Sequence, residues 1–171
     1  MPGMGVLGRV ADRLFGSNMP MVLIIVEIAL VVVLIRNIEC FLFITFYIPS
    51  EPIDMFKGVS AVVITLVMSI FTVETMIGLP SSKRSSWRTA VRTMILLVPT
   101  TLFYELTDYG YVALSTNTIL VVMAVTLLIM FLPHVRRYYV PFMTEAHPLK
   151  DWLKLIVLRP SQVPEYEFVY E

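Results

Sequence analysis

The sequence predicts an all-α fold: a four-helix transmembrane bundle with an interfacial amphipathic helix on its N-terminal side and another on its C-terminal side. The first observation is composition, since 57% of the 171 residues are hydrophobic, only 15% are charged, and the mean hydropathy is +0.80. A soluble domain carries about a quarter charged residues. The second observation is that the apolar residues gather in blocks of about the length that crosses a bilayer. We therefore expect a multi-pass integral membrane protein in contact with lipid.

The distribution of apolar residues divides the chain into three segments. The first contains a short interfacial helix, because Leu7, Val10 and Leu14 have helical spacing while Arg9 and Arg13 lie on the other side. The second contains the transmembrane helices, and the third contains another interfacial helix and a tail. In residue numbers these segments are 1–18, 19–133 and 134–171.

Four apolar blocks supply the predicted transmembrane helices. Their boundaries are 20–48, 58–79, 90–106 and 116–133. The second and the fourth have about the 20 residues that cross a hydrocarbon core. The third is shorter and contains Pro99, which removes a backbone hydrogen bond and is expected to kink the helix. The first would be about 43 Å long as a straight helix, so it has to tilt, bend or project from the bilayer.

The stretch HPLKDWLKLIVLRP, residues 147–160, predicts the C-terminal interfacial helix. Pro148 suits its first turn and Pro160 follows its end. Tryptophan prefers the depth of the lipid headgroups, so Trp152 fits an interfacial position. The expected apolar face comprises Leu149, Trp152, Leu153 and Ile156.

Lysine and arginine gather in segments that four crossings place on one side of the membrane. These segments are the N-terminus, the 80–92 loop and the residues after 133. The 49–57 and 105–115 segments, on the other side, together hold one lysine and four acidic residues. Because cytoplasmic loops carry the excess of Lys and Arg, we expect both termini in the cytoplasm. We expect a prokaryotic plasma membrane rather than an organelle membrane.

Ionisable residues also occur inside or at the ends of the apolar blocks, where each costs about 2.5–3.5 kcal/mol at a helix centre. Such residues normally face a partner or a wet cavity, so we expect them to pair in two layers. The inner layer, near the cytoplasmic face, comprises Glu27, Glu74, Arg88 and Arg92. The outer layer comprises Arg36, Glu39, Glu105 and Asp108. Within the outer layer we expect Arg36 to pair with Glu105 or Asp108.

A proton or cation path is the functional alternative to simple pairing. Carboxylates spaced through a bundle can relay protons. Glu39, Glu105 and Asp108, together with Asn37, could bind a hard cation. Such a conductor would have to act as an oligomer, because the four blocks show no inverted repeat.

Several classes of function are excluded by the residues present. The single cysteine, Cys40, leaves no disulfide, redox pair or Cys-rich metal site. His134 and His147 follow the last apolar block, so they cannot hold a haem between the helices. The sequence has no basic stripe for nucleic acid, no phosphate loop, no HExxH motif and no nucleophile–base pair. We therefore expect no catalytic residue, cofactor, metal site, nucleic-acid partner or soluble substrate.

Spaced charges between the second and fourth blocks resemble those of the PsiE-type family of small four-helix membrane proteins, named for phosphate-starvation induction. Glu74 in FTVETMIGL matches an acidic residue near the end of that family's second helix. Arg92 in SSWRTAVRTMILL matches an arginine opening the third, and Asp108 in YELTDYG matches an acidic residue ending it. The resemblance implies a four-helix membrane fold and no defined chemistry.

The missing cofactor ligands and the two interfacial helices favour a non-catalytic role. We expect a structural or accessory subunit that packs beside other membrane subunits in a larger complex, for example a respiratory or membrane-bound oxidoreductase assembly. The alternative is a small proton or cation conductor. An enzyme acting on lipid is a third option, for which the sequence supplies no nucleophile.

Overall fold

The computed structural model describes residues 19–46, 52–106, 115–140 and 148–158, and in these ranges the secondary structure is helical, with no strand. The prediction of an all-α fold is therefore confirmed for the described part of the chain. The predicted N-terminal interfacial helix lies outside these residues. The helices are α2 (Met21–Phe46), α3 (Pro52–Gly78), α4 (Arg84–Leu106), α5 (Thr116–Met130), α6 (Pro133–Tyr138) and α7 (Leu149–Val157).

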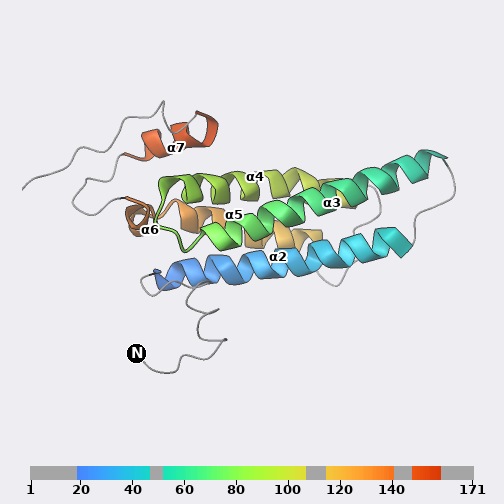
Figure 1. Ribbon diagram of the computed structural model, residues 1–171, viewed down its shortest axis with the longest axis horizontal. Helices are drawn as coiled ribbons and strands as arrows, with labels where there is room; N and C mark the ends of the chain where they lie inside the picture. Colours follow the sequence, from blue (N-terminus) through green and yellow to red (C-terminus); the bar gives the residue numbers. More distant parts are fainter. Residues whose placement is uncertain (1–18, 47–51, 107–114, 141–147, 159–171) are drawn as a thin grey trace, which may run out of the picture.

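The four long helices form an antiparallel bundle (Figure 1). α2 packs against α3 and α5, and α4 packs against the same two helices, so the ring of contacts closes. The short helix α6 follows α5 at one end of the bundle, and α7 packs on α4 at that same end (Figure 1). This arrangement places every long helix beside its neighbours in sequence, as short connections require.

Two helices are long and apolar enough to cross a membrane: Met21–Phe46 and Met55–Gly78. α5 is apolar but has only 15 residues. α4 has 23 residues, but Arg84, Arg88 and Arg92 lie in its first half. Apolar length alone therefore distinguishes α2 and α3 from the other two bundle helices.

The helix boundaries differ from the apolar blocks mainly at the N-terminal ends. α3 begins at Pro52 and α4 at Arg84, each about six residues before the predicted block. Hydropathy marks where the sequence becomes apolar, whereas a helix continues into polar residues, and proline is well tolerated at a first helical position. α4 also continues through Pro99.

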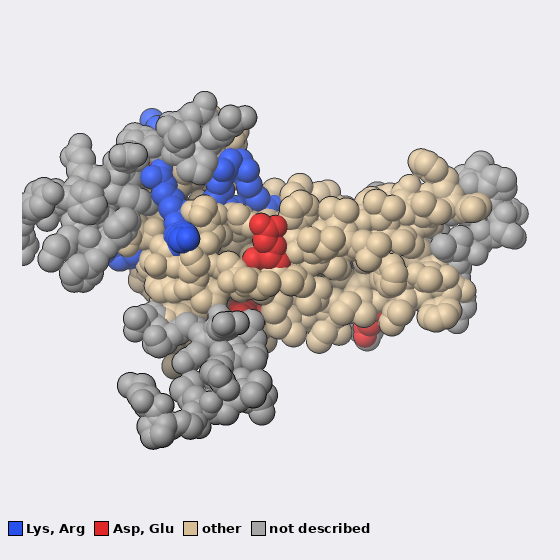
Figure 2. All heavy atoms as spheres, viewed as in Figure 1, with Lys and Arg blue, Asp and Glu red and all other residues tan. Residues whose placement is uncertain are grey.

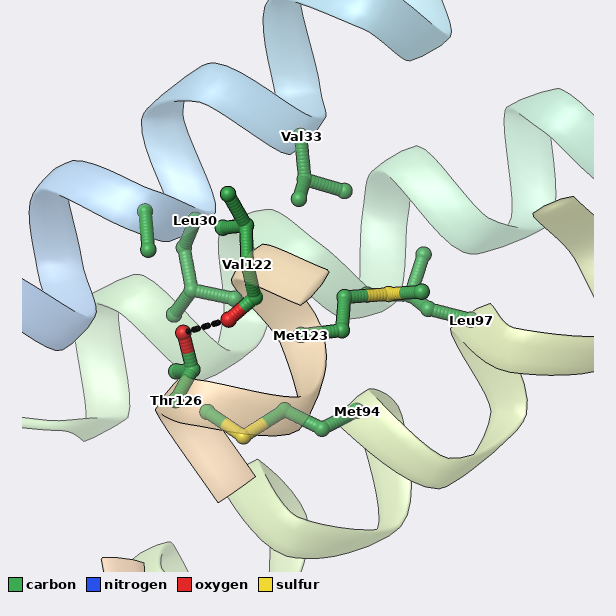
Figure 3. Close-up of a pocket in the computed structure, with 8 residues that line it drawn as sticks. Leu30, Val33, Met94, Leu97, Val122, Met123 and Thr126 are labelled. Carbon is green, nitrogen blue, oxygen red and sulfur yellow. Dashed lines mark hydrogen bonds between the residues drawn. The ribbon is translucent and has the colours of Figure 1, made fainter. Parts of the chain in front are cut away.

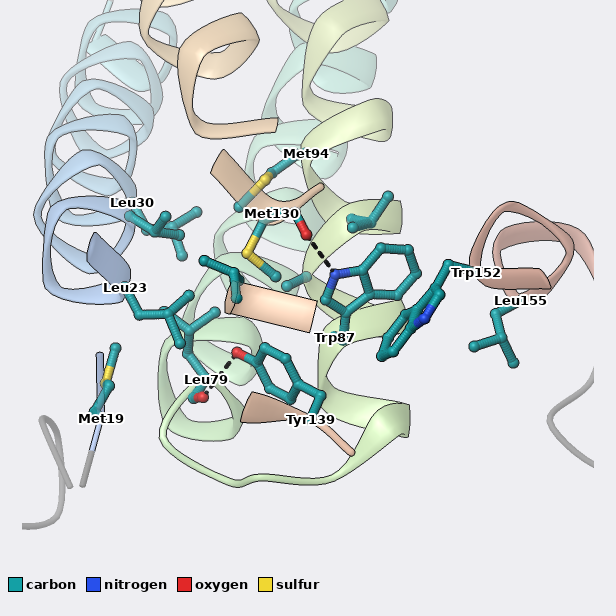
Figure 4. Packing of buried hydrophobic residues seen from close by; sticks show 14 of the residues in the cluster. Met19, Leu23, Leu30, Leu79, Trp87, Met94, Met130, Tyr139, Trp152 and Leu155 are labelled. Carbon is teal, nitrogen blue, oxygen red and sulfur yellow. Dashed lines mark hydrogen bonds between the residues drawn. The ribbon is translucent and has the colours of Figure 1, made fainter. Parts of the chain in front are cut away.

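Three apolar clusters follow one another along the bundle. The largest lies at the α6–α7 end, where Trp87, Trp152 and Tyr139 are buried together (Figure 4). The middle cluster consists of Val33, Met68, Leu97, Ile119 and Met123. The third, at the other end, consists of Cys40, Ile44, Ala61 and Tyr104.

Helix α7 divides its predicted apolar face between a side packed on the protein and an exposed side. Pro148 is its N-cap residue, in agreement with the predicted start. The side chains that it buries are Trp152 and Leu155, while Leu149 and Leu153 are exposed. The predicted apolar face, which was expected to lie at the membrane interface, comprised Leu149, Trp152, Leu153 and Ile156. In the structure α7 contacts α4 along one stripe and exposes a second apolar stripe.

Candidate functional site

A buried arginine on α2 connects three helices in the half of the bundle away from α6 and α7. The Arg36 side chain is only 1% exposed, and its Nη2 donates a hydrogen bond of 3.2 Å to Oγ1 of Thr116 on α5. The Thr116 hydroxyl in turn donates a bond of 2.5 Å to Oε2 of Glu105 on α4. Since a hydroxyl can accept one bond and donate another, Thr116 connects the guanidinium to the carboxylate. We call these three residues the Arg36 relay.

Aromatic and hydroxyl groups enclose the relay. The Arg36 guanidinium lies 5.8 Å from the centroid of the Tyr104 ring, within the range of a cation–π contact. The Tyr104 hydroxyl shares a short hydrogen bond with Thr65 on α3, and both residues are buried. With these contacts, side chains from all four bundle helices take part in one polar cluster.

The structure gives the other predicted members of the outer layer different surroundings. Arg36 and Glu105 come together, but through Thr116 rather than as the direct pair expected from the sequence. Glu39 is partly buried, and its Oε2 has no hydrogen-bond partner among the described residues. Asp108 lies outside the described residues.

The expected inner layer does not form one cluster among the described residues. Glu27 is 2% exposed, and neither of its carboxylate oxygens has a hydrogen-bond partner there. Glu74, by contrast, is exposed on α3. Arg92 donates from Nε to the carbonyl oxygen of Ile156 at 2.6 Å, so it contributes to the docking of α7. Arg88 is partly buried on α4.

The inner layer was expected from the charge and the depth of its residues alone. The rotation of each helix about its axis explains why these residues do not meet in the structure. Position along a helix gives the depth of a residue, but the face that it occupies depends on which side of the helix is packed. Glu27 belongs to the buried stripe of α2, whereas Glu74 lies on the side of α3 away from α2 and α4. Two carboxylates at similar depth therefore have opposite surroundings.

An apolar layer separates the Arg36 relay from the end of the bundle that contains Glu27. Beside this layer is a cavity of about 10 Å³ lined by Leu30, Val33, Met94, Leu97 and Met123, among others (Figure 3). The one hydroxyl in its lining, that of Thr126, bonds to the backbone oxygen of Val122 in its own helix. An apolar lining of this kind offers a water molecule few hydrogen-bond partners.

Aromatic groups close the end of the bundle that carries α6 and α7. The Trp87 ring packs edge-to-face on Trp152 with 4.7 Å between centroids, and its Nε1 donates to the Met130 carbonyl oxygen (Figure 4). The Tyr139 hydroxyl donates to the Leu79 carbonyl oxygen at 3.0 Å. Burial raises the pKa of this hydroxyl above the usual tyrosine value, which keeps it in the donor form.

Sequence reasoning missed the neutral members of the polar clusters. Thr116, Tyr104 and Thr65 carry no charge, so a pattern of charged residues does not reveal them. A usable signal was present: hydroxyl residues within apolar helices tend to hydrogen-bond across helices. A second such bond joins Thr75 on α3 to Thr93 on α4 at 2.9 Å.

Among the described residues no group of three or more His, Cys, Asp or Glu side chains could hold a metal ion. Comparison of the chain with protein-family models, curated proteins and solved structures finds no match. Its function has to be inferred from its own residues and their contacts.

Proposed function

We propose that the chain is a multi-pass membrane protein in which α2, α3, α4 and α5 all cross the bilayer, and that it serves as a non-catalytic accessory subunit of a larger membrane complex. The outer surface of every bundle helix supports the four crossings. Large apolar side chains are exposed on each: Ile28, Ile35 and Leu42 on α2, Val63 and Ile70 on α3, Ile95 and Leu102 on α4, and Val121 and Leu128 on α5. Soluble proteins rarely expose apolar surface on this scale.

The distribution of charge supports the proposed orientation. Basic side chains gather over α7 and the N-terminal part of α4, whereas most of the remaining visible surface of the bundle is uncharged (Figure 2). Because Lys and Arg are enriched on the cytoplasmic side, the end with α6 and α7 faces the cytoplasm. Both termini then lie there, in a prokaryotic plasma membrane. The spaced charges of the PsiE-type family fit the same four-helix arrangement.

The observation that best supports a structural role is that the buried polar side chains around Arg36 hydrogen-bond to one another. Arg36, Thr116 and Glu105 bond to one another across three helices, and Tyr104 and Thr65 join the fourth. Among the described residues, an apolar layer that includes Val33, Leu97 and Met123 lies between this cluster and Glu27. These contacts hold the bundle together, as expected for a subunit whose task is to pack beside other chains.

Purification of the native protein in a mild detergent tests the proposal. An accessory subunit should elute with other membrane chains in constant ratio. A chain that elutes only as a monomer or a homodimer would contradict the subunit role. In a matched purification with a harsher detergent, the same partners should dissociate and the chain should elute without them.

Glu27 favours a second candidate, a proton or cation conductor that acts as an oligomer. Its buried carboxyl has no hydrogen-bond partner among the described residues, and intramembrane carboxyl groups of this kind often carry protons. In that case Glu27→Gln should abolish an ion flux into liposomes without changing the elution profile. Equal flux through wild-type and variant liposomes would exclude this role for Glu27.

A further inference from the structure

The outward face of α3 carries a regular stripe that has no partner helix in the described chain. α3 directs Ala61, Thr65, Met68, Thr72 and Thr75 into the bundle. On the other side Val63, Val67, Ile70, Glu74 and Ile77 follow one another at alternating spacings of four and three residues and are all exposed. We call these five residues the α3 stripe. Spacing of this kind is the pattern by which one helix packs along another.

The stripe is apolar except for one carboxylate. Ile70 and Ile77, one turn to either side of Glu74, are 66% and 67% exposed. Glu74 lies within the segment Met55–Gly78, which is long and apolar enough to span a membrane, about 6 Å from its end. Facing lipid, an ionised carboxylate at this position is costly, and such groups normally have a partner of opposite charge.

From these observations we infer that the α3 stripe binds a transmembrane helix of another protein, and that this helix presents a lysine or arginine to Glu74. The inference rests on the proposed role as a subunit and identifies the face that docks. The β-branched residues fit against the partner helix, and the carboxylate sets its register, as a single polar residue does in a helical seam. An ion pair in this apolar setting also discriminates against partner helices without a basic residue.

A second copy of the chain is a poor occupant of the stripe. Two copies in one membrane have the same orientation, so a two-fold contact along the stripe would bring both Glu74 carboxylates to the same depth. Like charges in such a seam repel each other. The described residues of the stripe offer no cation that could offset this repulsion.

Site-specific photo-crosslinking in native membranes tests the inference. p-Benzoylphenylalanine replaces Ile77 on the stripe, or Val125, which is exposed on α5 and serves as the control position. The expected result is an adduct from position 77 only, whose partner peptide is an apolar segment containing Lys or Arg. Glu74→Leu should reduce this adduct about tenfold, whereas Leu128→Val, at an exposed position on α5 outside the stripe, should leave it unchanged. Elution as a single species shows that each variant is folded.

A charge exchange completes the test. Glu74→Lys should abolish the adduct, and replacing the basic residue of the partner peptide by Glu should restore it. Adducts with lipid or with a second copy alone would overturn the inference, as would an equal yield from Glu74→Leu. If the wild-type chain purifies with no other protein, the proposed function fails as well. If it purifies with partners that crosslink at position 125 and not 77, only the docking face is wrong.

Discussion

The Arg36 relay makes a quantitative prediction about Thr116. Replacing Thr116 by Val keeps the shape of the side chain and removes its hydroxyl. The Arg36 guanidinium then loses an acceptor, and the Glu105 carboxylate loses a donor. Because Arg36 is buried and this hydroxyl is its bonded partner, α2, α4 and α5 lose their shared polar contact in a single substitution.

The magnitude follows from the burial of the two charged ends. A hydrogen bond to a charged group contributes about 1.5–3 kcal/mol, and this range applies to the Arg36 end, which is buried. The Glu105 end is exposed, so its contribution is discounted to about 0–1 kcal/mol. Thr116→Val should therefore lower the free energy of unfolding by about 1.5–4 kcal/mol.

Unfolding in mixed micelles of SDS and a mild detergent, followed by circular dichroism, measures this change. Thr126→Val is the matched control, since Thr126 is also buried on α5 but its hydroxyl bonds only to the backbone of its own helix. The double variant Arg36→Met with Thr116→Val should lose less than the sum of the two single variants, because both remove the same contact. Equal stability of Thr116→Val and Thr126→Val would refute the relay.

Three further predictions concern α7, the cysteine and the orientation. Trp152→Ala removes a buried ring from the contact between α7 and α4, so it should accelerate tryptic cleavage within α7 at least about tenfold. Leu149→Ala, at an exposed position, should leave the cleavage rate unchanged, and mass spectrometry of limited digests measures both rates. Cys40 is buried and should react with maleimide only after the bundle is unfolded in SDS, and labelling of the native protein would contradict its position. In a Cys40→Ala background on intact cells, an impermeant maleimide should label Asn117→Cys and spare Ser82→Cys; the reverse pattern would invert the proposed orientation.

Much of the helix pattern could be predicted from hydropathy and proline positions. The start of α5 at Thr116 and of α7 after Pro148 agree with the sequence, because a serine N-cap and a proline are strong local signals. The early starts of α3 and α4 could not be predicted in the same way. Residues 52–57 and 84–89 carry charged side chains and precede the apolar blocks, although the helices already begin at Pro52 and Arg84.

The candidate site could be predicted only in part, because sequence gives depth more readily than direction. Arg36 and Glu105 were expected at comparable depth, and the structure does bring them into one relay. The intervening Thr116 was not expected, since a neutral hydroxyl leaves no mark in a charge pattern. Glu74 was assigned to the interior because its outward rotation depends on how α3 packs against α2 and α4.

Glu27→Leu tests, through its effect on stability, whether a favourable contact holds the buried carboxyl. A subunit that only packs gains nothing from the Glu27 carboxyl, whose oxygens have no hydrogen-bond partner within the described part of the chain, and burial of such a group costs about 1–3 kcal/mol. Glu27→Leu should therefore stabilise the bundle by about that amount in the SDS titration. Glu39→Leu, at a partly buried position on the same helix, should have a smaller effect. A loss of stability in Glu27→Leu would show that the carboxyl is held by a favourable contact, whereas a gain accompanied by loss of liposome flux would favour the conductor.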